Sequence, residues 1–405
     1  MHAFVVDQKK WISDAKFLHA LNYCMLLPGP EAQQLATYIG WLLHGVKGGL
    51  VAGVLFVLPS VFILLGLSMA YVTFGGIPWV SALFYGLKPA VVAIVILALI
   101  KIGKKSLHGW FHRMVALVSF IAIFFLQVPF PYIILSAIGI ALLAKKVFPA
   151  YFEEKSATQS HAALEQGYYL NLNSKIEAIT LTAAQFISRI SLTLLLWALP
   201  FGLFYVFSSQ TAFWNSLSLF FTKAALITFG GAYAVLPYVA QVAVEKLQWL
   251  SQLEMIDGLA LGETTPGPLI MVLAFVGFMA GYHTYSGSLL MGTAGLLATT
   301  YFTFLPCFCF ILVGGPLIER TQGNAQVKSV LGVVTAAVVG VVLNLTVYFA
   351  NAVVFPNGYM DPDVFSLLWV VLSFVAMHRF RLGMIPCIVI SALAGLGYYL
   401  AGLWL

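Results

Sequence analysis

Charged side chains are scarce in this sequence of 405 residues. Asp, Glu, Lys and Arg together make up 8% of it, whereas 61% of its residues are hydrophobic. A soluble domain carries about 25% charged residues, and the mean hydropathy of +0.97 also lies far outside the soluble range. The composition therefore excludes a soluble domain and predicts an integral membrane protein whose main partner is the lipid bilayer.

Cysteines and catalytic motifs are equally sparse. The sequence has no HExxH, GxSxG or GxxxxGK[ST] motif and its histidines are scattered, so neither an enzyme nor an ATP-driven pump is predicted. No groove of alternating basic and aromatic residues suggests nucleic-acid binding, and no pattern indicates a cofactor or a metal. The cysteines all lie in apolar segments, which favours small core residues over disulfides or a zinc site; they are Cys24, Cys307, Cys309 and Cys387.

Long apolar runs recur from end to end. A helix needs about 20 residues to cross the roughly 30 Å hydrocarbon core, and its backbone polar groups are then satisfied internally. The fold class predicted is an all-α polytopic membrane protein. We place spans near residues 48–73, 77–100, 114–129, 131–147, 178–208, 212–237, 288–316, 327–350, 362–378 and 383–404.

One long polar stretch interrupts these runs. Residues 145–177 show no apolar periodicity that would support a span. We interpret residues 148–177 as a cytoplasmic linker between an N-terminal half, 1–147, and a C-terminal half, 178–405. Nothing upstream of residue 11 has the order of basic, apolar and small residues typical of a cleaved signal peptide. The chain is therefore expected to be membrane-bound without a cleaved signal peptide.

Two Pro-Gly-Pro motifs interrupt apolar helical runs. Proline removes a backbone donor and clashes with the preceding turn, so a half-helix ends there, while the second proline suits the start of the next. Each break exposes a helix N-terminus with free N–H groups and a partial positive charge, and two such ends would form a cradle for an anion. The motifs are Pro28-Gly29-Pro30 and Pro266-Gly267-Pro268.

The segments around the two motifs are related to each other. They align with a constant offset from Trp11 and Trp249 onward, and FVLPS at 56–60 matches FTFLPC at 302–307. This similarity indicates an internal duplication. The basic connections are expected to face the cytoplasm, which places the loop at 44–48 inside and its counterpart around His283 outside. We therefore predict two homologous halves in inverted topology.

Two interpretations of the breaks remain at this point. Prolines commonly kink packed membrane helices without any further role. Interrupted helices at matching positions of inverted repeats are, however, the pattern of a secondary transporter with a binding site near the middle of the membrane. The repetition makes us prefer a substrate site.

Ionisable residues within apolar segments are the next signal, because they are costly in the membrane and often mark a transport pathway. Lys223 stands six residues before Phe229-Gly230-Gly231; it is a candidate partner for a dianion, or a lysine that extends to the headgroup region. Arg189 is as well explained by structural pairing as by function. Glu31 and Glu263 flank the breaks and are candidates for proton coupling, although Glu31 also suits the first turn of a helix.

Neutral polar residues beside the breaks complete the predicted site. Gln33, Gln34, Thr264 and Thr265 supply hydrogen-bonding groups suited to a tetrahedral oxyanion. Gly230 and Gly231 would let a backbone approach closely. Small-residue spacings elsewhere, such as Gly332, Ala336 and Gly340, are interpreted as helix packing.

At these residues the sequence resembles the chromate ion transporter family in its two-domain form. The resemblance covers essentially the whole chain and is carried by LNYCMLLPGPEAQQLATYIGW, TFGGAYAVLPYV, LALGETTPGPLIMVLAFVGF and HRFRLGMIPCIVISALAGL. It implies a carrier in the cytoplasmic (inner) membrane that exports chromate, a dianion shaped like sulfate, driven by the membrane potential or a proton gradient. The family's FGG motif maps onto Phe229-Gly230-Gly231, and its PGP motif maps onto both PGP motifs of this sequence. Its basic residue before FGG maps onto Lys223.

The N-terminal half departs from the family pattern. That half usually opens with its own basic residue, FGG motif and first helix, whereas this sequence begins with MHAFVVDQKKWISDAK. We therefore expect about one helix of the family fold to be absent from this half. A passive anion channel, or a carrier for another oxyanion such as sulfate, is the alternative function, because the charge and shape of sulfate match those of chromate.

Overall fold

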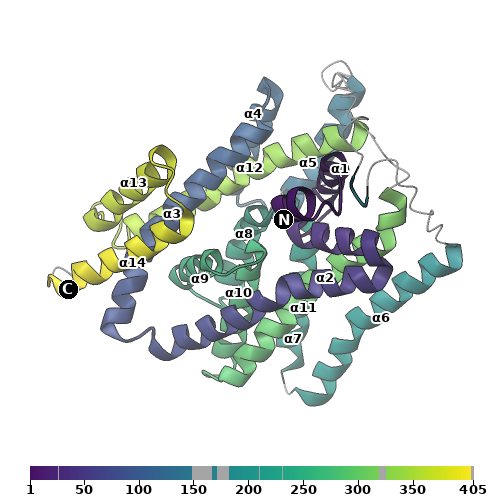
Figure 1. Cartoon of the computed structure of the whole chain (residues 1–405). Helices are drawn as coiled ribbons and strands as arrows, with labels where there is room; N and C mark the ends of the chain where they lie inside the picture. Colours follow the sequence, from purple (N-terminus) through teal and green to yellow (C-terminus); the bar gives the residue numbers. More distant parts are fainter. Residues whose placement is uncertain are drawn as a thin grey trace.

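The protein is helical throughout the part of the chain that the structure describes. The computed structural model describes residues 1–25, 27–147, 167–170, 182–208, 210–229, 231–318 and 325–402. Every named element in these ranges is a helix (Figure 1). In chain order they are η1 (Ala3–Gln8), α1 (Asp14–Cys24), α2 (Glu31–Phe74), α3 (Pro78–Ser106), α4 (Trp110–Phe124), α5 (Phe130–Val147), α6 (Ala183–Phe207), α7 (Thr211–Ile227), α8 (Ala232–Val239), η3 (Ala240–Lys246), α9 (Gln252–Thr264), η4 (Leu269–Met271), α10 (Val272–Thr284), α11 (Leu289–Ile318), α12 (Ala325–Val354), α13 (Val364–Arg379) and α14 (Met384–Leu400).

Five of these helices are long and apolar enough to cross a membrane, namely α2, α3, α6, α11 and α12, and shorter apolar helices accompany them. Large apolar side chains such as Phe62, Leu195 and Leu290 are exposed on their outer faces, as expected where lipid rather than water covers the protein. The predicted fold class, an all-α polytopic membrane protein, is confirmed.

The predicted spans coincide with helices, with one exception. We predicted a single span at 212–237, but the structure divides it into α7 and α8 at residues 228–231. Most of the predicted linker, 148–177, lies outside the described residues. The part that is described pairs with the N-terminal segment, because the Ser13 N–H donates to the Leu170 carbonyl at 2.8 Å and the Leu170 N–H donates to the Trp11 carbonyl at 3.0 Å.

Helix α2 is in fact two helical segments that fold back on each other. His44 and Gly45 leave helical geometry, with φ of −139° and +63°. A Cβ atom added to Gly40 would lie 2.5 Å from the Gly48 carbonyl oxygen. The glycines thus let the segments before and after the turn pack backbone against backbone, as small residues do between membrane helices.

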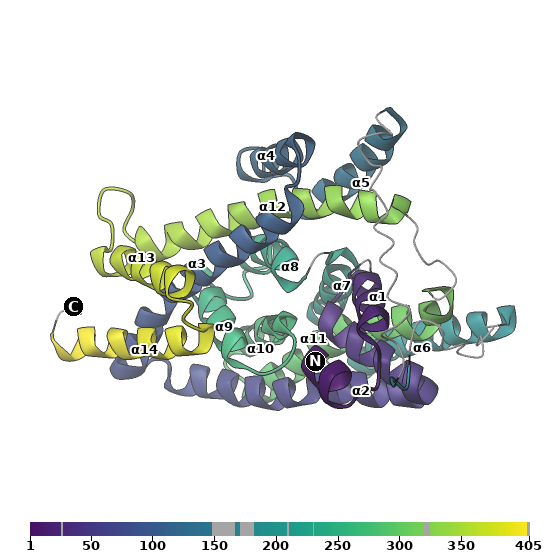
Figure 2. The same cartoon turned by 45° about the horizontal axis from the view of Figure 1, so that its top comes forward.

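Short helices occupy the centre of the molecule. Figure 2 shows α8, α9 and α10 between the long helix α12 on one side and α2 on the other. Helix α10 packs along α11, and α3 packs along both α12 and α14. The predicted packing role of small residues is confirmed for Gly340, where a Cβ would overlap the Ala116 carbonyl of α4. The breaks that precede α8 and α10 therefore lie in the region between α2 and α12 (Figure 2).

Candidate functional site

The backbone before each Pro-Gly-Pro motif follows the same sequence of local structures. A π-helical turn comes first, η1 in one half and η3 in the other. Lys10 and Gln248 follow, both with φ of 50°. The Trp11 N–H then donates to the Val5 carbonyl at 2.8 Å, and the corresponding bond of Trp249 measures 2.9 Å. Two unrelated segments would not share a rare turn, a positive φ and this hydrogen bond at one constant offset.

The correspondence continues to the motifs themselves. Ser13 and Ser251 are the N-cap residues of α1 and α9, and each side chain accepts a hydrogen bond from the backbone three residues later. Gly29 and Gly267 have φ of +115° and +124°, values that glycine adopts without strain. The predicted duplication is therefore present in the backbone. The inverted orientation of the two copies in a membrane stays a prediction.

The first break is closed by residues of the other half. Helix α1 ends at Cys24 and α2 begins at Glu31, after Pro30 in an extended conformation. The Gly29 N–H donates to the Thr228 carbonyl at 2.8 Å, and Gln34 Nε2 donates to the Pro28 carbonyl at 2.7 Å. Gly29 and Pro30 are buried. One backbone donor of this break is thus already occupied by the segment that follows α7.

The second break has the same backbone geometry but is more open. Helix α9 ends at Thr264, and η4 and α10 begin after Pro268. Pro266 and Gly267 are exposed, in contrast to the buried Gly29. The Ser60 hydroxyl of α2 donates to the Pro266 carbonyl. The two copies of the motif therefore differ in accessibility rather than in conformation.

The LPS and LPC motifs of the repeat contact the breaks reciprocally. Ser60, in the first half, lies against the break of the second half, where a Cβ on Gly267 would overlap its hydroxyl. Cys307, in the second half, lies against the break of the first half, with its Sγ 2.5 Å from the position of a Cβ on Gly29. Each half thus supplies the side chain that covers the other half's glycine.

A third break lies between α7 and α8, where sequence reasoning placed a continuous span. Helix α7 ends at Ile227, and α8 begins at Ala232 after Gly231, whose φ is +100°. A Cβ on Gly231 would meet no atom within 4 Å. Phe229 packs against the core beside it, and Gly230 is outside the described residues. The close backbone approach predicted at Gly231 is therefore not found there; the backbone contact of this segment is made by Thr228, whose carbonyl accepts from the Gly29 N–H.

The predicted neutral groups fall into two kinds. Gln33 and Gln34 are fully buried, and the side-chain oxygen of each has no hydrogen-bond partner among the described residues; Gln33 Nε2 donates to Thr37 Oγ1 at 3.0 Å. Thr264 and Thr265 instead donate their hydroxyl hydrogens to carbonyls of α9, at 2.8 and 2.7 Å. The free amide oxygens and the two threonine hydroxyls can therefore only accept in this arrangement, and each amide can donate further only through the second hydrogen of its Nε2.

The two predicted glutamates have different settings. Glu31 is the first residue of α2, the position where a helix dipole favours a carboxylate. Glu263 accepts a hydrogen bond from the hydroxyl of Tyr233, the second residue of α8. This bond ties the helix after the third break to the helix before the second break. Both side chains are half-buried.

The two predicted basic residues lie on α6 and α7. Arg189 Nη1 donates to the Leu312 carbonyl at 2.6 Å. The alternative that Arg189 makes a structural pairing is therefore confirmed. Lys223 is exposed on the face of α7 that also exposes Leu219 and Leu226. This is the placement expected of a lysine that extends along a lipid-facing helix. Substrate contact by Lys223 stays a prediction.

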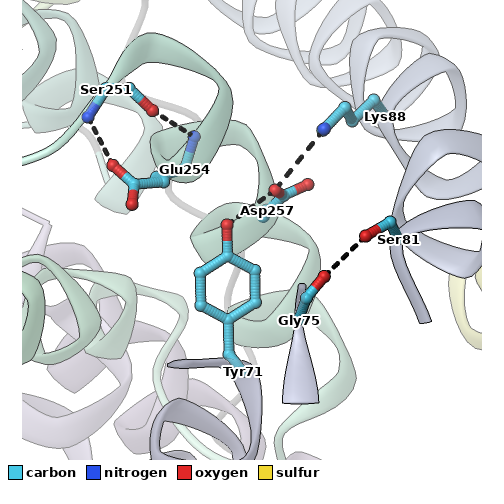
Figure 3. A network of polar contacts seen from close by, with 7 residues as sticks. All are labelled: Tyr71, Gly75, Ser81, Lys88, Ser251, Glu254 and Asp257. Atoms are coloured by element: carbon cyan, nitrogen blue, oxygen red, sulfur yellow. Dashed lines mark hydrogen bonds and ion pairs between the residues drawn. The ribbon is translucent and has the colours of Figure 1, made fainter. Parts of the chain in front are cut away.

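Sequence reasoning missed one buried charged cluster, drawn in Figure 3. Asp257 of α9 lies 3.6 Å from Lys88 Nζ of α3, and the Tyr71 hydroxyl of α2 donates to the same carboxylate oxygen at 2.9 Å. The signal was available, because Lys88 stands within the apolar run of a predicted span and intramembrane ionisable groups tend to be functional. Its partner was not identifiable from the sequence alone.

Comparisons with known proteins agree on one family. The chain matches the family model described as chromate transporter over residues 1–143 and 215–396. A chromate transport protein of Cupriavidus metallidurans is 28% identical over 355 residues, which cover 87% of this chain and 77% of that protein.

Two further relatives extend the match to almost the full chain. A chromate transport protein of Pseudomonas aeruginosa is 30% identical over 400 residues, covering 96% of this chain and 85% of the relative. An uncharacterized transporter of Methanocaldococcus jannaschii is 24% identical over 392 residues, which cover 96% of this chain and 87% of that transporter. No solved structure matches the chain. The match over both halves and the identity to these relatives establish that this chain belongs to the chromate transporter family.

Proposed function

We propose that the protein is a secondary carrier that exports chromate, or a closely similar tetrahedral dianion, across the cytoplasmic membrane. The relatives named as chromate transport proteins support the substrate. The observation that carries the mechanism is the direct linkage of the three helix breaks. Gly29 of the first break is bonded to Thr228 of the third, and Tyr233 after the third break is bonded to Glu263 before the second.

This linkage connects the segments that lead into three helix N-termini, those of α2, α8 and the η4–α10 segment. Each N-terminus offers backbone N–H groups without an intrahelical partner and a partial positive charge. In a low-dielectric interior these dipoles attract an anion more strongly than they would in water. We propose that the substrate binds there, with the second Nε2 hydrogens of Gln33 and Gln34 as further hydrogen-bond donors and with Glu31 and Glu263 as candidates for proton coupling.

The unequal accessibility of the two PGP motifs supports alternating access. Gly29 is buried and its N–H is bonded to Thr228, whereas Gly267 is exposed. A carrier that exchanges these two arrangements would open the site to one side of the membrane at a time, as inverted-repeat transporters do. A channel would instead keep both breaks accessible together.

The test is transport by the purified chain in liposomes. For a dianion, a potential of about 100 mV is worth roughly 4.6 kcal/mol and shifts the equilibrium concentration ratio on the order of a thousandfold. We expect potential-driven, saturable chromate movement that is accelerated by chromate on the opposite side, and slowed by sulfate in proportion to its affinity. The absence of chromate movement in folded protein would refute the proposal. Movement without acceleration by opposite-side substrate would indicate a channel.

A further inference from the structure

The cluster around Asp257 is a buried charged site that the helix breaks do not use. The Asp257 side chain is 4% exposed and that of Lys88 is 20% exposed. Oδ2 of Asp257 is close to both Lys88 Nζ and the Tyr71 hydroxyl, whereas Oδ1 is buried without a hydrogen-bond partner among the described residues. One carboxylate oxygen is therefore satisfied and the other has room for a proton.

A second titratable pair leads from this carboxylate toward the end of α10. Glu254 lies three residues, or about one helical turn, before Asp257 on α9. Glu254 Oε2 accepts from the Ser251 N–H at 2.6 Å, and Glu254 Oε1 lies 3.5 Å from His283 Nε2. The His283 and Glu254 side chains are 39% and 23% exposed, so exposure falls from His283 through Glu254 to Asp257.

The hydrogen-bonding of His283 places a hydrogen on Nδ1. His283 Nδ1 lies 2.9 Å from the Trp249 carbonyl oxygen, and a carbonyl only accepts, so Nδ1 carries hydrogen. Nε2 then faces a carboxylate oxygen, and this contact is attractive only if Nε2 also carries hydrogen or Glu254 is protonated.

We propose that Asp257 is a proton-binding site of the carrier, supplied through His283 and Glu254, and that its protonation state controls the contact between α9 and α3. The proposal rests on the transport function proposed above. When Asp257 is ionised, it holds Lys88 of α3 and the hydroxyl of Tyr71 of α2. When Oδ1 takes a proton from the Glu254 side, the carboxyl group becomes neutral and Lys88 remains an ammonium ion without its counter-charge.

The mechanical consequence follows from where α9 ends. Helix α9 runs from Gln252 to Thr264 and leads directly into the second Pro-Gly-Pro motif. Its charged attachment to α2 and α3 joins the second half of the chain to the first. Among the described residues, the charged or titratable groups that act on Asp257 are Lys88, Tyr71 and Glu254. Loss of the Lys88 contact would therefore free α9 to move together with the break at its end.

The experiment measures chromate accumulation in liposomes at zero membrane potential, with and without a pH difference. If one proton moves per chromate, a difference of one pH unit changes the steady-state concentration ratio about tenfold, whatever the orientation of the protein in the vesicle. We expect Asp257→Asn to abolish this tenfold response while chromate exchange at equal concentrations on both sides continues. His283→Gln is expected to slow the approach to the same tenfold ratio.

Two further variants make the result decisive. Asp363→Asn is the matched control, because Tyr85 of α3 donates to Asp363 Oδ2 at 2.7 Å in a contact of the same chemistry without a lysine; it is expected to keep the tenfold response. The double variant Asp257→Asn with Lys88→Gln removes both charges. It is used in place of Asp257→Asn if the single variant fails to fold. A tenfold response in folded protein without Asp257 would overturn the inference, as would wild-type transport that ignores the pH difference. Wild-type protein with no chromate transport would refute the proposed function itself.

Discussion

Replacing Gly29 with alanine tests whether the first break depends on glycine. The φ of +115° is strained for any residue with a Cβ, at a cost of about 1–3 kcal/mol. The added Cβ would also lie 2.5 Å from Cys307 Sγ and 3.0 Å from Gln34 Nε2, and such overpacking costs about 1–3 kcal/mol more. We therefore expect Gly29→Ala to destabilise the protein by about 2–6 kcal/mol.

The two contributions can be separated by further substitutions. Cys307→Ala removes the Sγ atom, so it is expected to recover about 1–3 kcal/mol in the Gly29→Ala background and to leave the strain in place. Gly45→Ala is the control for strain alone, because Gly45 has φ of +63° and a Cβ there would meet no atom within 4 Å. Gly45→Ala should therefore cost less than Gly29→Ala.

The assay is thermal unfolding of each purified variant in detergent, followed by chromate transport for those that remain folded. Equal stability of Gly29→Ala and the unsubstituted protein would refute the geometry of the break. If Cys307→Ala gave no recovery, the contact between the two halves at this point would not be tight. Recovery of stability without recovery of transport would mean that the positive φ itself is needed for substrate binding.

Three other predictions concern the second break, Lys223 and the linker. Gly267→Leu is expected to abolish transport in protein that still inserts, because its side chain would collide with Ser60; unchanged transport would remove this break from the site. If the predicted substrate contact of Lys223 holds, Lys223→Gln is expected to lower transport by more than about tenfold, or 1.4 kcal/mol; transport close to wild type would instead support the alternative of a lipid-facing lysine, which the exposure of Lys223 on α7 favours. Deletion of residues 155–166, which spares the pairing of Leu170 with the N-terminal segment, should have little effect in a growth or transport assay.

Much of this architecture was predictable because the membrane restricts what an apolar run can do. The spans followed from hydropathy, and both PGP breaks followed from the two properties of proline, a missing donor and a fixed φ. The break between α7 and α8 was missed because membrane helices tolerate glycine, so the apolar run at 212–237 gave no sign that Gly231 has φ of +100°.

The parts of the site that depend on packing were not predictable. Lys88 was visible as a lysine in an apolar run, but its partner lies in the other half of the chain, and their 3.6 Å approach depends on how α3 packs against α9. Lys223 shows the converse case. Its sequence position beside the FGG motif suggested the interior, whereas the rotation of α7 places it with Leu219 and Leu226 on an exposed face.

The contact of Cys307 with Gly29 gives the protein an intrinsic chemical reporter. The thiol is buried against the closed break, and a buried apolar environment keeps a thiol unreactive. Any motion that opens this break uncovers the sulfur, so the rate of maleimide labelling in a chain whose only cysteine is Cys307 measures how often opening occurs. The influence of substrate, voltage and pH on the conformational cycle can then be measured as a change in the labelling rate of a native side chain.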